Sequence, residues 1–131
     1  MSTPSQHRID ALNYSRSQRM LTLTFSDGAE FKLSAEFLRV FSPSAEVRGH
    51  GPGQETLQTG KSSVAIAGIE PIGHYAIQIS FDDGHDSGLY NWSYLRDLSE
   101  RQDQYWQRYL QQLEAVGQTR EPDIQVLHFT P

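Results

Sequence analysis

The sequence predicts a small α+β domain with a mostly antiparallel β-sheet built from hairpins. Residues 21–25, 30–34 and 75–81 alternate apolar and polar side chains, and this period is typical of half-buried strands. Between residues 92 and 116, apolar side chains instead recur every three or four positions, as they do in amphipathic helices. The fold class therefore includes a short helix after an Asp-Gly-His loop and an amphipathic C-terminal helix.

The first strands and their turn follow from local chemistry. Residues 1–7 are expected to form a flexible tail, and an edge strand is expected to begin near Ile9. The strand at 21–25 leads into Ser-Asp-Gly, a turn sequence in which glycine supplies a positive φ. The chain returns as the strand at 30–34, so the two strands are predicted to form a hairpin.

The middle of the chain holds a long irregular segment. Ser34 is suited to cap a single helical turn over 34–39. Pro, Gly, Ser and other polar residues dominate 42–63, and a connection this long in a compact domain is either mobile or functional. A short apolar strand at 64–67 is expected to pair with the strand at 75–81. The inward face of that second strand is expected to carry Tyr75, Ile77, Ile79 and Phe81.

The C-terminal part is predicted to be helical. Asn91 is suited to cap a helix that carries Trp92 and further apolar residues at helical spacing. Ser99 begins a Ser-x-x-Gln capping box, which predicts a second helix that ends at Gly117. The predicted organisation is a flexible tail (1–7), a domain (8–98), a C-terminal helix (99–117) and a tail or edge strand (118–131).

Composition and charge exclude several classes of protein. The 131 residues suffice for one domain. The net charge is −5, Lys32 and Lys61 are the only lysines, and basic residues do not cluster, which argues against nucleic acid or an anionic membrane as a partner. The absence of cysteine excludes disulfides and thiolate metal sites. Because neither a signal peptide nor a long apolar run is visible, a cytoplasmic location is expected.

The loop at 82–86 is the strongest candidate for chemistry. It places three carboxylates around His85 at the end of a predicted strand, where loops usually present functional side chains. One interpretation is a metal or acid–base site. In that case His85 and Asp83 act together with His50, which lies in the Gly-rich part of the irregular segment.

The alternative interpretation is a structural turn, which the frequency of Asp and Gly in turns favours. Its carboxylates then accept hydrogen bonds from backbone N–H groups, and His85 packs on Trp92 or Tyr90. His74 lies at the other end of the predicted strand, more than about 20 Å from His85. These two histidines are therefore not expected to share a metal ion.

Catalytic motifs of the common classes are absent from the sequence. It contains no Gly-x-Ser-x-Gly elbow and no phosphate-binding loop. It also lacks a His-x-Asp pair with a distant histidine, the spacing that would indicate a non-haem iron site. A small enzyme built on the Asp-Gly-His loop is consequently the least supported of the functional hypotheses.

Four ordered motifs resemble a known family. They are Leu23-Thr-Phe-Ser-Asp-Gly28, Leu38-Arg39 with Ser-Pro-Ser-Ala after it, Ile72-Gly-His-Tyr-Ala76, and Asp83-Gly-His85 followed by Tyr90-Asn-Trp92 and Leu95. Together they resemble the γ-butyrobetaine hydroxylase-like N-terminal domain over residues 8–98. The resemblance implies that in oxygenases of this family the module precedes a 2-oxoglutarate-dependent iron domain. No such catalytic domain is visible in these 131 residues.

The resemblance also implies a zinc site made by Cys-x-Cys-x-x-Cys and the histidine of the Gly-His motif. The cysteine positions fall near Ser42, Ser44 and Val47, and the histidine position falls on His85. Serine hydroxyls and a valine do not replace thiolates at a structural zinc. We therefore expect the zinc site to be lost and His85 to serve packing or hydrogen bonding.

These observations favour a non-catalytic binding or adaptor domain that acts with a separate protein. The resemblance extends to a domain appended to plant iron–sulfur carrier proteins, which implies a role in iron–sulfur or other metal-cofactor handling. A metal-ion-binding protein and a small enzyme are the alternatives. The predicted interaction surface consists of His74, Tyr75, His85, Tyr90 and Trp92.

Overall fold

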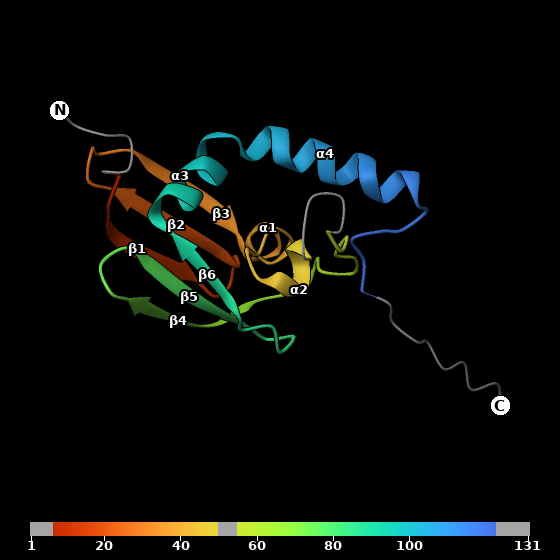
Figure 1. The fold of residues 1–131 in the computed structure, drawn as a ribbon, viewed down its shortest axis with the longest axis horizontal. Helices are drawn as coiled ribbons and strands as arrows, with labels where there is room; N and C mark the ends of the chain where they lie inside the picture. Colours follow the sequence, from red (N-terminus) through yellow and green to blue (C-terminus); the bar gives the residue numbers. More distant parts are fainter. Residues whose placement is uncertain (1–6, 50–54, 123–131) are drawn as a thin grey trace.

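Two three-stranded antiparallel sheets and four helices form the fold, in a computed structural model that describes residues 7–49 and 55–122 (Figure 1). The first sheet has the order β1-β2-β3 and the second the order β4-β5-β6. The strands are β1 (Ile9–Ser15), β2 (Met20–Phe25), β3 (Glu30–Ser34), β4 (Ile66–Ile72), β5 (Ala76–Phe81) and β6 (Gly88–Asn91). The predicted α+β class with hairpin-built antiparallel strands is confirmed, as two small sheets.

The first sheet contains the predicted hairpin. Leu21 pairs with Leu33 across β2 and β3, and Gly28 in the turn has a φ of +89°. Alternation along β2 directs Leu21, Leu23 and Phe25 inward, where each is almost fully buried. The edge strand predicted at Ile9 is present as β1 and pairs with β2.

The second sheet differs from the prediction at its first strand. The strand expected at 64–67 instead begins at Ile66 and continues through Pro71 to Ile72. Proline is tolerated there because β4 is an edge strand. The turn is therefore 73–75, and Tyr75 lies in it with 61% of its surface exposed, not on the inward face of β5. The other three predicted inward residues are buried: Ile77, Ile79 and Phe81.

Two short elements were not predicted. The strand β6 follows the Asp-Gly-His loop and has only four residues, too few for alternation to reveal it. Within the segment predicted as irregular, α2 (Ala45–Arg48) forms one turn, and the Ser44 hydroxyl accepts a hydrogen bond from the Glu46 N–H at 3.2 Å. This cap fixes the chain direction directly after α1.

Two of the other three helices begin at the capping residues that the sequence predicts. Ser34 caps α1 (Ala35–Val40), and Asn91 caps α3 (Trp92–Glu100). The predicted capping box at Ser99 is wrong: this residue lies inside α3, and its hydroxyl donates to the Leu95 carbonyl at 2.7 Å. The second helix, α4 (Gln102–Ala115), starts without a side-chain cap.

A main apolar core lies between the sheets, α1 and α3, and a smaller one lies under α4. The smaller cluster contains Val40, Tyr109 and Leu113, and Figure 1 shows α4 extending along one side of the molecule beyond α1 and α2. None of the described helices is long and apolar enough to cross a membrane.

The chain beyond α4 is anchored as far as it is described. Arg120 donates two hydrogen bonds to the Glu36 carboxylate, at 2.8 and 2.7 Å. Backbone hydrogen bonds also join Gly60 to Thr119 and Ser62 to Arg120. The edge strand considered for the last residues lies outside the described part of the chain.

Candidate functional site

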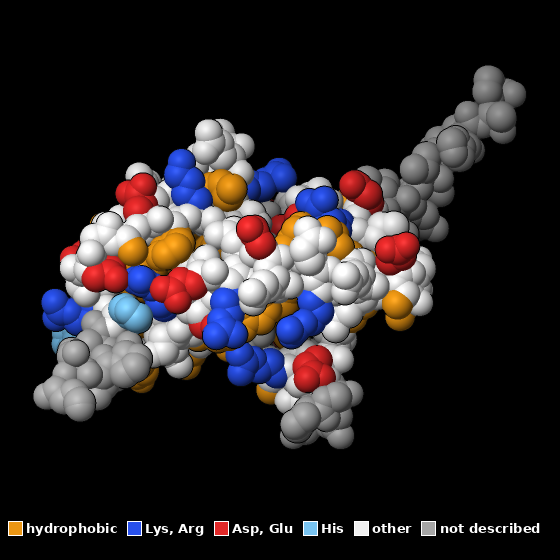
Figure 2. Space-filling model, turned by 90° about the horizontal axis from the view of Figure 1, so that it is seen from above, with side chains coloured by type: hydrophobic (Ala, Val, Ile, Leu, Met, Phe, Trp, Pro, Cys, Tyr) orange, Lys and Arg blue, Asp and Glu red, His pale blue; other side chains and the backbone are white. Residues whose placement is uncertain are grey.

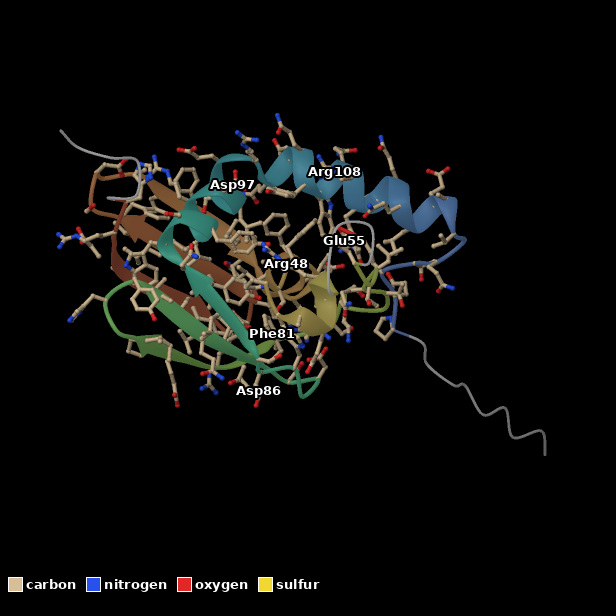
Figure 3. The ribbon with its side chains drawn as sticks, in the orientation of Figure 1. Arg48, Glu55, Phe81, Asp86, Asp97 and Arg108 are labelled. Atoms are coloured by element: carbon tan, nitrogen blue, oxygen red, sulfur yellow. The ribbon has the colours of Figure 1, made fainter. Side chains whose placement is uncertain are left out.

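The carboxylates of the β5–β6 loop organise its backbone, as the turn interpretation predicts. Asp82 accepts a hydrogen bond from the Ala65 N–H, and Asp83 accepts one from the His85 N–H, both at 3.1 Å. Asp86 is exposed and lies at the edge of the molecule (Figure 3). Two of the three carboxylates therefore bond backbone N–H groups.

Asp83 is also the centre of an ion-pair network. Its Oδ2 accepts hydrogen bonds from Arg39 Nε at 2.8 Å and from Lys61 Nζ at 2.7 Å. Burial on its own would raise the pKa of Asp83, but the hydrogen bonds from Lys61, the His85 backbone and Arg39 together lower it to about 2. The carboxylate is consequently ionised at neutral pH and joins α1 to the loop.

His85 is buried, and both of its ring nitrogens have partners. Its Nε2 lies 2.8 Å from Ser42 Oγ, and its Nδ1 lies 3.0 Å from Glu46 Oε2. Since a carboxylate only accepts, Nδ1 carries the proton, and in the neutral ring Nε2 accepts from the serine hydroxyl. The nearest described aromatic contact of His85 is Phe81, with ring centroids 6.1 Å apart, instead of the predicted Trp92 or Tyr90.

Serine, histidine and glutamate are thus connected in the order found in hydrolase triads. Their exposure is the reverse of what catalysis requires: Ser42 is 1% exposed, whereas the Glu46 side chain is 70% exposed. A nucleophilic serine faces its substrate while the carboxylate is buried behind the histidine. This arrangement therefore supports a structural connection between α2 and the loop better than it supports an acyl-transfer site.

Only part of the predicted interaction surface is accessible. Trp92 donates from Nε1 to the His74 carbonyl at 2.8 Å and from its backbone N–H to the Tyr75 carbonyl at 2.9 Å. These bonds hold the exposed β4–β5 turn against the start of α3. His85 and Tyr90 are 4% and 0% exposed, so neither can belong to a surface, and the prediction is wrong for these two.

A cavity of about 560 Å³ lies between α2, residues 55–58, α3 and α4. Its lining is mainly apolar and aromatic and includes Tyr94, Tyr105 and Tyr109, with Arg48 and Arg108 among its polar members. Figure 3 shows Arg108 on α4 and Arg48 and Glu55 in the region below it, and Glu55 also lines the cavity. The sequence hypotheses did not identify this cavity, although part of its wall belongs to the segment expected to be mobile or functional.

Comparison with known proteins connects this geometry to a family. The family model for the γ-butyrobetaine hydroxylase-like N-terminal domain matches residues 12–96. The chain belongs to this family. A comparison with curated proteins finds no match.

Solved structures of similar proteins agree with the assignment of this chain to the γ-butyrobetaine hydroxylase-like N-terminal domain family. Two NMR solution structures share 47% and 44% sequence identity, with TM-scores of 0.77 and 0.78, and the alignments cover 95% and 99% of this chain and 99% of each of theirs. A crystal structure of an Acidithiobacillus ferrooxidans protein of unknown function from the DUF971 family shares 33% identity, with a TM-score of 0.61. That alignment covers 75% of this chain and 98% of the other.

Of the four positions that the family resemblance associates with zinc, Ser42 and His85 are in direct contact, but the side chains at the four positions do not fit the metal. Ser42 bonds directly to His85, and Ser44 Oγ lies 2.7 Å from Ser87 Oγ. Val47 is buried and has no donor atom. Direct hydrogen bonds between side chains occupy the ligand positions, and neutral hydroxyls are poor zinc ligands.

The alternative metal set of His85, Asp83 and His50 has limited geometric support. His50 lies outside the described residues. Among residues 7–49 and 55–122, no group of three or more His, Cys, Asp or Glu side chains is arranged to hold a metal ion. The family resemblance places a cysteine position near Ser42, but no sequence pattern connects Glu46 to His85, which lies 39 residues away.

Proposed function

We propose that this chain is a non-catalytic binding domain that acts with a separate protein through the turn between β4 and β5. The observation that most directly supports this proposal is the exposure of Tyr75. This aromatic residue is 61% exposed, while its backbone carbonyl accepts a hydrogen bond from the Trp92 N–H. An aromatic residue held in place loses little conformational entropy on binding, and such residues often dominate the energy of protein interfaces.

The neighbouring groups support this choice of surface. His74 is exposed beside Tyr75, and its carbonyl accepts the Trp92 indole hydrogen bond, so the turn has two fixed attachment points. Leu89 on β6 is 50% exposed and pairs with Gln78 of β5, the strand that follows this turn. An aromatic side chain, an imidazole and an apolar strand residue together suit a protein partner.

The proposed process is iron–sulfur or other metal-cofactor handling, with the partner being the carrier or the protein that receives the cofactor. Support for this process comes from the resemblance to a domain attached to iron–sulfur carrier proteins. Under this proposal the domain recognises the partner and holds no cofactor of its own, which fits the hydroxyl and valine side chains at the zinc positions.

The test compares partner capture by the wild type with capture by Tyr75→Ala and Val116→Ala. Val116 is 59% exposed at the end of α4, so it is a control of similar exposure at another place. Captured proteins are identified by quantitative mass spectrometry, and the best candidate is purified and titrated by calorimetry. Tyr75→Ala is expected to weaken binding at least about tenfold, and Val116→Ala less than about twofold.

Two results would contradict the proposal. The first is the absence of any protein that binds the purified wild type saturably. The second is a partner that binds Tyr75→Ala as tightly as the wild type. A Trp92→Phe variant adds a finer test, because it keeps the aromatic ring but removes the donor to the His74 carbonyl, and it is expected to weaken binding with the fold retained.

A further inference from the structure

The cavity between α2, residues 55–58, α3 and α4 has a rigid aromatic wall. The Tyr94 hydroxyl donates to the Phe41 carbonyl at 2.6 Å, and the Tyr109 hydroxyl donates to the Gln58 carbonyl at 2.7 Å. The Tyr105 hydroxyl bonds to Asp97. Because all three hydroxyls are engaged, the rings are fixed in orientation, and their faces and edges are what the cavity presents.

The size and lining suit a small organic molecule. The volume of about 560 Å³ falls within the range of about 300–1,000 Å³ that is common for small-molecule sites. Such sites are mostly apolar and contain a few polar groups that orient the ligand. Here the described lining comes from all four helices and residues 55–58, and its cationic groups are arginines.

The two arginines of the cavity contact its aromatic rings instead of a carboxylate. Arg39, Arg96, Arg101 and Arg120 each form an ion pair. Arg48 and Arg108 form none with another described residue, and the same holds for Arg8, Arg16 and Arg19. The Arg48 guanidinium instead lies 4.7 Å from the centre of the Tyr94 ring, and that of Arg108 lies 6.0 Å from the Tyr105 ring.

The local charge is opposite in sign to that of the whole chain. Among the described lining residues, two arginines stand against one acidic side chain, Glu55, whereas the chain carries a net charge of −5. Figure 2 shows basic side chains gathered around hydrophobic ones on the face that carries α4. A positive site in an acidic protein selects for an anionic group on a ligand that fits the apolar volume.

We propose that this cavity binds a small organic anion that consists of a flat apolar or aromatic body and one carboxylate, sulfonate or phosphate group. The body packs against the partly buried rings of Tyr94 and Tyr105, and the anionic group pairs with Arg48 and Arg108. Guanidinium groups match planar, multi-oxygen anions through paired N–H donors. The site is separate from the β4–β5 turn, so it does not depend on the proposed protein partner.

The experiment uses two fluorescent probes with the same hydrocarbon body. The first is 8-anilino-1-naphthalenesulfonate, which is anionic, and the second is N-phenyl-1-naphthylamine, which lacks the sulfonate. Each is titrated into the folded wild-type chain, and two-dimensional ¹H–¹⁵N NMR locates the shifts. Saturable binding of the anionic probe is expected, with at least tenfold higher affinity than the neutral probe and with shifts confined to the cavity lining.

Variants separate the contribution of the arginine charges to probe affinity from non-specific hydrophobic binding. The double variant Arg48→Gln/Arg108→Gln is expected to reduce affinity for the anionic probe at least tenfold and to change affinity for the neutral probe less than twofold. Arg16→Gln, which replaces an exposed arginine in the turn between β1 and β2, is the matched control and is expected to leave both affinities unchanged. Arg48 and Arg108 are exposed, so their replacement is expected to preserve the NMR spectrum of the fold.

Two results would overturn the proposal: equal affinities of the two probes for the wild type, or shifts that fall outside the cavity. Should the double variant not fold, Arg108→Gln alone and the wild-type probe comparison still decide the question. Unchanged capture of the protein partner by the double variant would show that the two sites are independent. Loss of probe binding in Tyr75→Ala, with the fold intact, would contradict their separation.

Discussion

Replacing Asp83 by asparagine is expected to destabilise the protein at neutral pH and to have little effect in strong acid. The folded-state pKa of this carboxyl lies at about 2, against an ordinary value of 3.8. At about 1.4 kcal/mol per pKa unit, the difference corresponds to roughly 2 kcal/mol. Since 22% of the side chain is exposed, solvent screening reduces the expected contribution to about 1–2 kcal/mol.

The pH dependence has a definite direction. A carboxyl whose pKa is lowered in the folded state contributes its full stabilisation above the ordinary value, and this contribution is lost as pH falls through the folded-state pKa. For Asp83 the loss therefore begins near pH 4 and is largely complete at about pH 2. The Asp83→Asn variant lacks this dependence, so its stability is expected to approach that of the wild type in acid.

The assay is urea unfolding of wild type, Asp83→Asn and Asp86→Asn at several pH values between 2 and 7. Asp86 belongs to the same loop and is exposed, so Asp86→Asn is a control of identical chemistry. It is expected to change the free energy of unfolding by less than about 0.5 kcal/mol. A constant difference between wild type and Asp83→Asn across the pH range, or an equal loss in both variants, would refute the reasoning.

Three further predictions concern packing, a buried charge and metal binding. In Gly88→Ala, the new Cβ would lie 2.6 Å from Ser42 Oγ. We therefore expect the free energy of unfolding, measured with urea, to fall by about 1–3 kcal/mol. An unchanged unfolding midpoint would count against this contact. Arg120→Ala removes the partner of Glu36, whose side chain is 8% exposed while that of Arg120 is 42% exposed, so a loss of about 1–3 kcal/mol is expected, and a loss below about 1 kcal/mol would show a weak pair. Zinc titration followed by NMR is expected to leave the His85 ring signals in place, because both ring nitrogens are hydrogen-bonded; saturable shifts would support the metal-binding alternative.

Several elements could be predicted because the signal is contained in a few neighbouring residues. The hairpin needs only alternation and an Asp-Gly turn, and the caps at Ser34 and Asn91 need one side-chain oxygen within reach of an N–H group three residues later. The errors arose where such local signals are ambiguous. Ser99 has the sequence of a cap but bonds within α3, and β6 has too few residues for a period.

The candidate site was predictable only in part for a related reason. The Asp-Gly-His loop was recognised from its composition, and its role as a turn follows from the preference of aspartate for backbone N–H groups. The partners of His85 could not be found in this way, because Ser42 and Glu46 lie 43 and 39 residues away. The cavity likewise collects side chains from all four helices and residues 55–58, which are adjacent only after α4 has packed.

In the turn between β4 and β5, too, the sequence identifies the residues and the tertiary structure decides which of them are exposed. Its sequence, Gly-His-Tyr, identified the residues that now carry the proposed function, but only the packing of Trp92 shows that Tyr75 is held outward while Tyr90 is buried. Short-range patterns thus specify the α+β class, the hairpins, the family and the lack of thiolate ligands. The tertiary structure decides which polar groups pair, which aromatic rings face solvent and where a cavity forms, because these depend on contacts between segments whose separation along the chain leaves no periodic trace.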